Sequence, residues 1–303
     1  MSNVNAFVPS RRLGVVGLGL VGCALAQRLT QAGYTCVGYD VREAAMRAFA
    51  DSGHTTCAAP EDLLHEANTL VLAVFDTDGV EAVVQALLEA RARQGLTSSP
   101  LALIDCSTGD PERLAALAQR LAALGIRFVE APLSGSSAQI AQGQATLLTA
   151  GAPQDVAAVA PVLEAISPQR IAVGLAGMAA RAKLATNLVL GLNRAALAEG
   201  FVLAESMGIT PQAFLQLVLA SPARSDAALA KGEMMVRGEF APQSRIRQHA
   251  KDVQLMLSMA DRTGQHLPLS ATHAQLLQRA IEAGDGELDN AAILRQIQRE
   301  RRP

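Results

Sequence analysis

The chain has 303 residues, which is long enough for about two domains with sizeable cores. Half of it is hydrophobic, and its 26 basic and 28 acidic residues give a net charge of −2. This balance excludes the broad positive surface through which proteins bind nucleic acid. With 7 Phe, 2 Tyr and no Trp, the chain also lacks the aromatic side chains that stack single-stranded bases.

The apolar stretches, cysteines and histidines indicate a soluble protein of the cytoplasm. No uncharged apolar run reaches the roughly eighteen residues that a membrane-spanning helix requires. The four cysteines are scattered without a C-x-x-C pair, as expected for reduced cytosolic thiols, and the five histidines show no ligand spacing. We therefore expect no metal, no contact with a membrane and no nucleic-acid partner.

An apolar stretch at residues 13–26 follows Arg11 and Arg12 and allows two interpretations. A basic pair, a short apolar run and Cys23 loosely resemble a secretory signal with its cleavage site. The same stretch contains three glycines in G-x-G-x-x-G spacing, and cleavage before Cys23 would remove them. The elements that follow favour the second interpretation.

These glycines lie between a strand predicted at residues 13–16 and a helix predicted at 23–32. A second strand, predicted at 34–39, ends in Asp40, which stands 23 residues beyond Gly17. Strand, glycine turn, helix, strand and acid in this order are typical of a dinucleotide-binding unit. The segment predicted to contact the cofactor is Gly17-Leu18-Gly19-Leu20-Val21-Gly22.

Each glycine of this segment has a physical task. Gly17 permits the sharp turn, and Gly19 lets the backbone approach a pyrophosphate at the N-terminus of the helix. Gly22 lets the helix pack closely on the strand. Asp40 would accept hydrogen bonds from the adenosine ribose and repel a 2′-phosphate, so we expect NAD; Arg42 leaves NADP possible or is a solvated residue of the next helix.

Strands and helices continue to alternate as far as Gly177. We predict strands at residues 69–74, 101–106, 126–130, 146–150 and 170–173, and helices at 80–91, 111–124 and 154–166. This alternation predicts an α/β fold of the Rossmann type, with a doubly wound, mostly parallel sheet. After Gly177 the chain becomes helical, beginning with a long helix at 178–207. We predict a dinucleotide-binding domain at 1–177 and an all-helical domain for substrate and oligomerisation at 178–303, joined by that helix. Residues 1–10 and 299–303 are expected to be solvated and poorly ordered.

The long helix carries the strongest candidate for acid–base chemistry. Only three of the basic residues are lysines, and Lys183 lies in a stretch that is apolar nearly all round. Lys183, Asn187 and Gly191 share one face because they are four residues apart. Burial would lower the pKa of Lys183 toward neutrality, where an amine can exchange a proton with an alcohol. The alternative is a lysine that extends to solvent.

Five segments together resemble the β-hydroxyacid dehydrogenases, the family typified by 3-hydroxyisobutyrate dehydrogenase. They are the glycine turn at 17–22, Asp105-Cys106-Ser107-Thr108-Gly109-Asp110-Pro111, Glu130-Ala131-Pro132-Leu133-Ser134-Gly135-Ser136, Gly174 to Gly177 with Lys183 and Asn187, and Lys251-Asp252. Their order and spacing make the resemblance specific, and it extends over residues 13–293.

The resemblance implies a role for each matching position. Lys183 would be the general acid/base, and Asn187 would hydrogen-bond the substrate. Ser134, Gly135 and Ser136 would hold the substrate carboxylate. Lys251 would close over the substrate and cofactor, and the remaining expected cofactor contacts are Phe75, Ser107 and Thr108. The family further implies a homodimer or homotetramer.

Three departures from the family pattern bear on the substrate. Ser136 replaces a usual glycine, Glu130 replaces a usual aspartate, and Phe75 begins a loop where many members carry Leu-Pro. The first two changes predict a narrower or more polar pocket wall. We expect an NAD-dependent dehydrogenase of a small 3-hydroxy acid or its semialdehyde. The alternatives are an imine reductase, which generally lacks the lysine, and a non-catalytic dinucleotide sensor.

Overall fold

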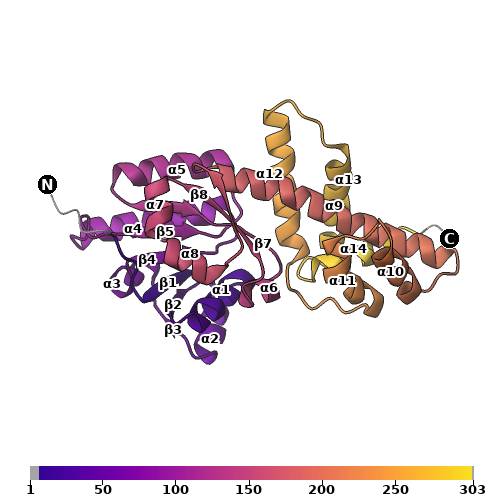
Figure 1. Ribbon diagram of the computed structural model, residues 1–303, viewed down its shortest axis with the longest axis horizontal. Coiled ribbons are helices and arrows are strands. Elements are labelled where there is room, and N and C mark those ends of the chain that lie inside the picture. The colour runs from indigo at the N-terminus through magenta and orange to yellow at the C-terminus, as the bar shows by residue number, and fades with distance from the viewer. Residues whose placement is uncertain (1–6, 302–303) are drawn as a thin grey trace. The chain divides into compact units, whose positions relative to one another are not determined.

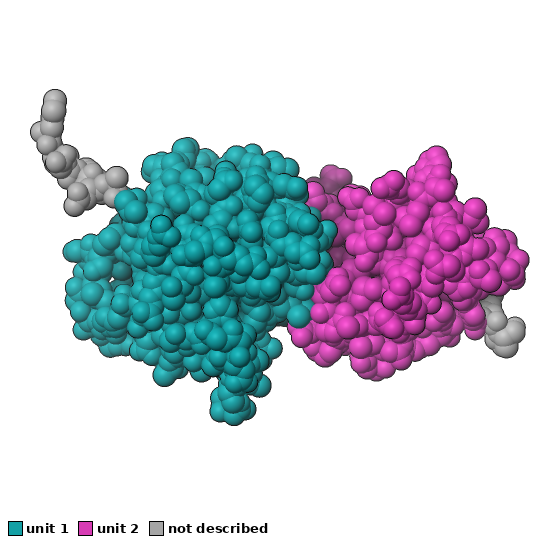
Figure 2. All heavy atoms as spheres, turned by 60° about the horizontal axis from the view of Figure 1, so that its bottom comes forward, with its two compact units in different colours: residues 1–183 teal, residues 184–303 magenta. Residues whose placement is uncertain are grey.

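The computed structural model describes residues 7–301, and the chain divides into two compact units, residues 1–183 and 184–303 (Figure 2). The division falls inside the long helix α9 (Met178–Ser206), whose first six residues belong to unit 1. The domain boundary predicted at residue 177 stays a prediction.

Unit 1 is built on a single sheet with helices on both faces (Figure 1). Its strands are β1 (Arg12–Val16), β2 (Thr35–Tyr39), β3 (Thr55–Thr56), β4 (Thr69–Leu72), β5 (Ala102–Asp105), β6 (Arg127–Glu130), β7 (Leu133–Ser134), β8 (Thr146–Gly151) and β9 (Arg170–Gly174). They lie in the order β3-β2-β1-β4-β5-β6-β8-β7, with β9 beside β8. Strands β1 to β6 are parallel, whereas β8 is antiparallel to β6 and β7. The predicted Rossmann-type, mostly parallel sheet is confirmed.

The strands supply two cores because successive side chains point to opposite faces. The helices of unit 1 are α1 (Leu20–Gln31), α2 (Glu43–Asp51), α3 (Leu63–Glu66), α4 (Thr77–Arg93), α5 (Pro111–Ala123), α6 (Ser137–Ala141), α7 (Pro153–Ala158) and α8 (Ala160–Ile166). Val15, Val71 and Ile104 pack in one core with α1 and α8, and Leu70 and Leu103 pack in the other with α4 and α5. Both faces of the sheet are therefore covered, as a parallel sheet requires.

Three predicted helices differ from the structure, and the first of them, predicted at 23–32, already begins at Leu20. The helix predicted at 154–166 is wrong as a single element, because α7 and α8 are separated at Val159. Pro161 explains the break, since it has no N–H to continue the hydrogen bonds of α7. The helix predicted to begin at Val80 begins at Thr77, because the Asp76 side chain caps it by accepting a hydrogen bond from the N–H of Gly79 at 2.9 Å.

Unit 2 is helical, which confirms the prediction that the chain becomes all-helical in its C-terminal part. After α9 follow α10 (Pro211–Ala220), α11 (Asp226–Arg237), α12 (Ile246–Arg262), α13 (Pro268–Glu282) and α14 (Ile293–Arg299). All six helices contribute side chains to one hydrophobic core, which includes Phe201, Leu215, Val253 and Leu277. Within the described part of the chain, α9 is the one helix whose length and composition would allow it to cross a membrane, a test that core helices of soluble proteins also pass.

A buried ion pair joins three segments of unit 2. The ammonium of Lys231 donates to Oδ2 of Asp289 at 2.9 Å, and both side chains are almost inaccessible. The same oxygen accepts from the backbone N–H groups of Gln243 and Ser244, at 2.9 and 3.1 Å, and Oδ1 accepts from Ala291 at 3.0 Å. One carboxylate therefore holds α11, the loop before α12 and the segment that leads into α14.

Replacing this carboxylate should destabilise the protein strongly. We expect Asp289→Ala to lower the free energy of unfolding by about 3–5 kcal/mol, because the ammonium of Lys231 stays buried without its partner. Denaturant unfolding of the full chain measures the change. The matched control is Glu287→Ala. The exposed carboxylate of Glu287 pairs with Arg245 and Arg247, and its loss should lower the free energy of unfolding by less than about 1 kcal/mol.

The described residues near the two ends are partly or fully exposed, as expected for solvated ends, but several of them also make contacts within the protein. The Phe7 ring lies 4.5 Å from the guanidinium of Arg127, and Ser10 donates its N–H to Asn68 at 2.8 Å. Arg301 pairs with Glu205. Residues 1–6 and 302–303 lie outside the described part.

Candidate active site

The glycine turn joins β1 to α1 at the carboxyl edge of the sheet. A methyl group at Gly17 would overlap the carbonyl oxygen of Ala73, and one at Gly22 would overlap the carbonyl oxygen of Gly17. At Gly19 the same methyl would meet no atom closer than 3.9 Å, and no side chain caps the N-terminus of α1. Two glycines thus permit close packing, and the third leaves open the approach to uncapped helix N–H groups. This arrangement fits a pyrophosphate.

Asp40 lies beside this turn at the end of β2. Its Oδ2 accepts the N–H of Leu18 at 2.8 Å, and its Oδ1 accepts the N–H of Arg42 at 2.8 Å. The guanidinium of Arg42 also donates to both oxygens, at 3.0 and 2.9 Å. Burial acts to raise the pKa of Asp40, but these hydrogen bonds outweigh it and hold the pKa below its usual value. Arg42 is therefore an ion-pair partner of Asp40, rather than the merely solvated residue considered from sequence.

The loops after β4 and β5 lie together at the same edge of the sheet. The hydroxyl of Ser107 accepts the N–H of Val74 at 3.1 Å, which ties one loop to the other. Ser107 and Thr108 are buried, whereas Phe75 is 48% exposed. The carboxyl edge of a parallel sheet is where dinucleotides bind, so the location fits the predicted cofactor contacts of all three residues.

The predicted carboxylate-binding loop follows β6 and leads into α6. Gly135 packs against Ala145: a methyl group added at Gly135 would come within 2.8 Å of the Ala145 methyl group. Ser136 caps α6: its N–H donates to Gln139 Oε1 at 2.8 Å, and its hydroxyl accepts the N–H of Gln139 at 3.3 Å. The backbone N–H of Ser136 is thus engaged, and its hydroxyl still has a proton to donate. Ser134 is half-buried at the end of β7.

Lys183 is the last residue of unit 1 and is only 7% exposed, which disagrees with the alternative of a solvent-extended lysine. Glu130 binds the first turn of the same helix: its carboxylate accepts the N–H of Gly177, and the N–H of Ala180 at 2.8 Å. The Glu130 side chain is therefore directed at α9, whereas the family pattern led us to expect it in the wall of the substrate pocket.

The predicted residues of unit 2 share one carboxylate. Asp252 Oδ2 accepts from Asn187 Nδ2 at 3.1 Å, and Asp252 Oδ1 lies 3.1 Å from the ammonium of Lys251. The structure thus brings Asn187 and Lys251 to the same acid. Sequence reasoning assigned Asp252 no role, although its place next to Lys251 in the family segment was a usable signal. No group of three or more His, Cys, Asp or Glu side chains suited to a metal occurs within residues 7–301.

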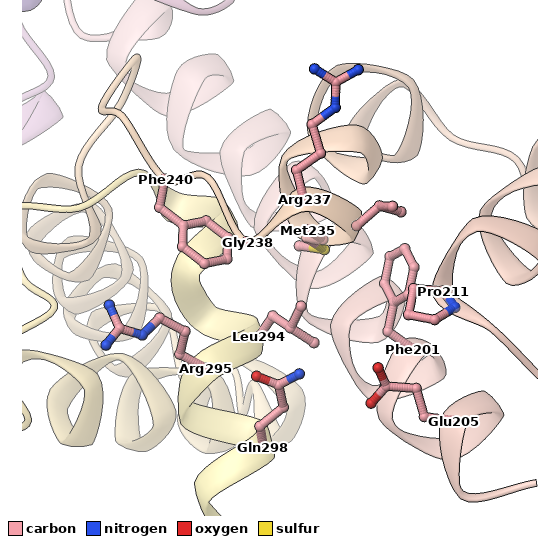
Figure 3. Close-up of a pocket in the computed structure, with 11 residues that line it drawn as sticks. Phe201, Glu205, Pro211, Met235, Arg237, Gly238, Phe240, Leu294, Arg295 and Gln298 are labelled. Atoms are coloured by element: carbon pink, nitrogen blue, oxygen red, sulfur yellow. The ribbon is translucent and has the colours of Figure 1, made fainter. Parts of the chain in front are cut away.

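A surface pocket of about 390 Å³ in unit 2 contains none of the predicted residues (Figure 3). Two of its charged side chains are already paired within the protein, Arg237 with Glu233 at 2.9 Å and Arg295 with Asp285 at 3.1 Å. We assign this pocket no part in the chemistry.

Comparison with known proteins places this geometry in a family. The family described as the NAD binding domain of 6-phosphogluconate dehydrogenase matches residues 12–174, and that described as NAD-binding of NADP-dependent 3-hydroxyisobutyrate dehydrogenase matches residues 177–297. The chain is also 30% identical over 287 residues to L-threonate dehydrogenase from Cupriavidus necator, across 94% of this chain and 96% of that one. The chain belongs to the β-hydroxyacid dehydrogenase family. As a β-hydroxyacid dehydrogenase, it is an NAD(P)-dependent enzyme that acts on the CH–OH group of hydroxy acids.

Solved structures agree with this β-hydroxyacid dehydrogenase fold. The 3-hydroxyisobutyrate dehydrogenase of Salmonella typhimurium superimposes with a TM-score of 0.79 at 24% identity, covering 94% of this chain and 99% of that one. The 3-hydroxyisobutyrate dehydrogenase of Mycobacterium tuberculosis, solved with L-serine, gives a TM-score of 0.80 at 22% identity, covering 95% and 99%. At these identities the likeness shows the fold.

Proposed function

We propose that this enzyme oxidises a small 3-hydroxy acid, or reduces the matching semialdehyde, with Lys183 as the general acid/base. The observation that carries the proposal is a lysine that is 7% exposed, in the second turn of a helix whose start is capped. Burial of a lysine side chain disfavours its charged form relative to the neutral amine, which is the form that can accept a proton from a hydroxyl. Asn187 stands one turn further along the same face of α9.

The chain's own residues have separable tasks in the oxidation. Lys183 receives the proton of the substrate hydroxyl as the carbinol carbon is oxidised, and it returns a proton to the carbonyl oxygen in the reverse direction. Asn187 hydrogen-bonds the substrate, held by Asp252. The loop of Ser134 and Gly135 binds the carboxylate, and the Ser136 hydroxyl adds one donor. A bound nicotinamide supplies the site that accepts the hydride.

A panel of hydroxy acids tests the reaction. Purified protein with NAD or NADP should form the reduced cofactor with at least one of 3-hydroxyisobutyrate, 3-hydroxypropionate, glycerate, L-threonate and 4-hydroxybutyrate. The name of the L-threonate dehydrogenase relative supports including a polyhydroxy acid. Absence of turnover across the panel, with cofactor binding intact, would contradict the proposed substrate class.

The cofactor proposal is a preference for NAD, set by Asp40 and moderated by Arg42. We expect Asp40→Ser to shift the ratio of kcat/KM for NADP over NAD upward by about 10-fold or more, because a carboxylate repels a 2′-phosphate. Arg42→Ala should shift the ratio the other way, since it leaves the charge of Asp40 without its counterion. Steady-state kinetics with each cofactor measure both, with Glu43→Gln, an exposed acid on α2, as the matched control. An unchanged ratio in both variants would contradict the assignment.

We further propose a homodimer or homotetramer located in the cytoplasm. The exposed apolar side chains of Val189 and Leu203 on α9, and of Met207 directly after it, support self-association, because Val189 and Leu203 stand two heptads apart and so share one side of the helix. Sedimentation of the full chain tests this, and a monomer at assay concentration would contradict it.

A further inference from the structure

The carboxylate of Glu130 forms a helix cap supplied by a distant strand. Helix α9 begins at Met178, so Gly177 stands at its N-cap position and Ala180 at its third residue. The N–H groups at these two positions are the pair that a local capping box satisfies with two side chains. Here both donate to one carboxylate at the end of β6, 47 and 50 residues away in sequence.

The same residue connects two parts of the proposed site. Ala180 stands three residues before Lys183, which is less than one helical turn. Glu130 stands four residues before Ser134, at the start of the carboxylate-binding loop. Both connections lie within unit 1. We propose that Glu130 is a positioning residue, which fixes the lysine-bearing turn of α9 relative to the loop that holds the substrate carboxylate. This inference rests on the proposed function of Lys183.

The tight surroundings of the cap make Glu130 hard to replace. A methyl group at Gly177 would come within 2.8 Å of the Pro111 carbonyl oxygen, so the start of α9 packs closely on the start of α5. Glu130 is 1% exposed, which leaves no solvent to satisfy the two N–H groups in its absence. A glutamine at this position has one accepting oxygen, and its NH₂ group would face the second N–H group.

The cap is also sensitive to protonation. Burial raises the pKa of Glu130 to about 7, although the N–H groups of Gly177 and Ala180 lower it. The charged groups that face it are Asp105, which raises the pKa, and Arg181, which lowers it. A protonated carboxyl retains one good acceptor, so the cap weakens as the pH falls through about 7.

The pH dependence of the reductive reaction separates Glu130 from Lys183. In this direction Lys183 acts as the acid, so its own titration lowers kcat on the alkaline side. Loss of the Glu130 cap lowers kcat on the acidic side, below about pH 7. In the aldehyde-reducing direction, wild-type kcat should therefore fall at both low and high pH. The decrease at low pH, the acidic limb, should arise from protonation of Glu130.

The experiment compares wild type, Glu130→Gln, Glu130→Asp and the control Asp226→Asn, an exposed first-turn acid of α11. We expect Glu130→Gln to lower kcat by about 10- to 100-fold, the scale of a misplaced catalytic group, with NADH affinity unchanged and no acidic limb. Amide exchange at Ala180 should be faster than in wild type. Glu130→Asp, which keeps the charge but is one methylene shorter, should retain an acidic limb with a lower kcat, and Asp226→Asn should match wild type.

The outcomes distinguish the two proposals. Wild-type kcat and an intact acidic limb in Glu130→Gln, while turnover still depends on Lys183, would overturn the positioning role alone. If Glu130→Gln does not fold, wild-type kcat in Glu130→Asp would overturn it equally. Turnover that does not depend on Lys183 would overturn the proposed function, and amide exchange at Ala180 would then still report whether Glu130 caps the helix.

Discussion

Lys183→Ala should lower kcat by about 10²-fold or more, the usual loss when a positioned acid/base is removed. Binding of NADH should be nearly unchanged, because the glycine turn and Asp40, which we assign to the cofactor, lie on β1, α1 and β2. Equal losses in kcat and kcat/KM would indicate an interaction made only in the transition state. Steady-state kinetics and a fluorescence titration of NADH measure the two effects.

The control for this variant is Lys251→Ala, which removes an ammonium that pairs with Asp252. It should raise KM more than it lowers kcat, because we assign Lys251 to closure over the ligands rather than to proton transfer. Near-normal turnover in Lys183→Ala would refute the assigned role. A large loss of NADH affinity in Lys183→Ala would show that the lysine acts through the cofactor site instead.

Gly19→Ala should weaken cofactor binding by about 10- to 100-fold with little loss of stability. The new methyl group would meet no protein atom closer than 3.9 Å, so the fold accommodates it. It would stand where the backbone is expected to approach the pyrophosphate, and overpacking of this kind costs about 1–3 kcal/mol. Calorimetric titration with NADH and thermal unfolding measure the two quantities.

Gly22→Ala is the informative partner of this variant. Its methyl group would overlap the carbonyl oxygen of Gly17, so backbone has to move. We expect this variant to lose both stability and cofactor affinity, whereas Gly19→Ala loses affinity alone. Wild-type affinity in Gly19→Ala would contradict the placement of the pyrophosphate at this turn.

The sequence was sufficient to predict the sheet and the cofactor turn because both depend on short-range patterns. Apolar runs, glycine spacing and the acid after β2 all lie within about 30 residues, and the strand order of unit 1 agrees with them. Pro161 also carried a local signal for the break between α7 and α8, which the apolar periodicity of residues 154–166 obscured.

The contacts that position the site were not predictable because they connect distant segments. Glu130 reaches Gly177 across 47 residues, and Asn187 reaches Asp252 across 65. No spacing rule links such pairs. The ion pair of Arg42 with Asp40 is local, but an arginine two residues after an acid is equally compatible with exposure to solvent. Which polar groups face one another depends on how the distant segments pack in the folded protein.

Chemical rescue of Lys183→Ala by small amines tests the central claim most directly. Adding methylamine or ammonia should restore hydride transfer, with a rate that increases with the concentration of neutral amine. The substitution leaves a cavity where the lysine side chain stood, and a small amine bound there can take over the proton transfer. Methylamine should not accelerate wild type. Hydride transfer in Lys183→Ala as fast as in wild type without any added amine would contradict the claim that this lysine moves the proton.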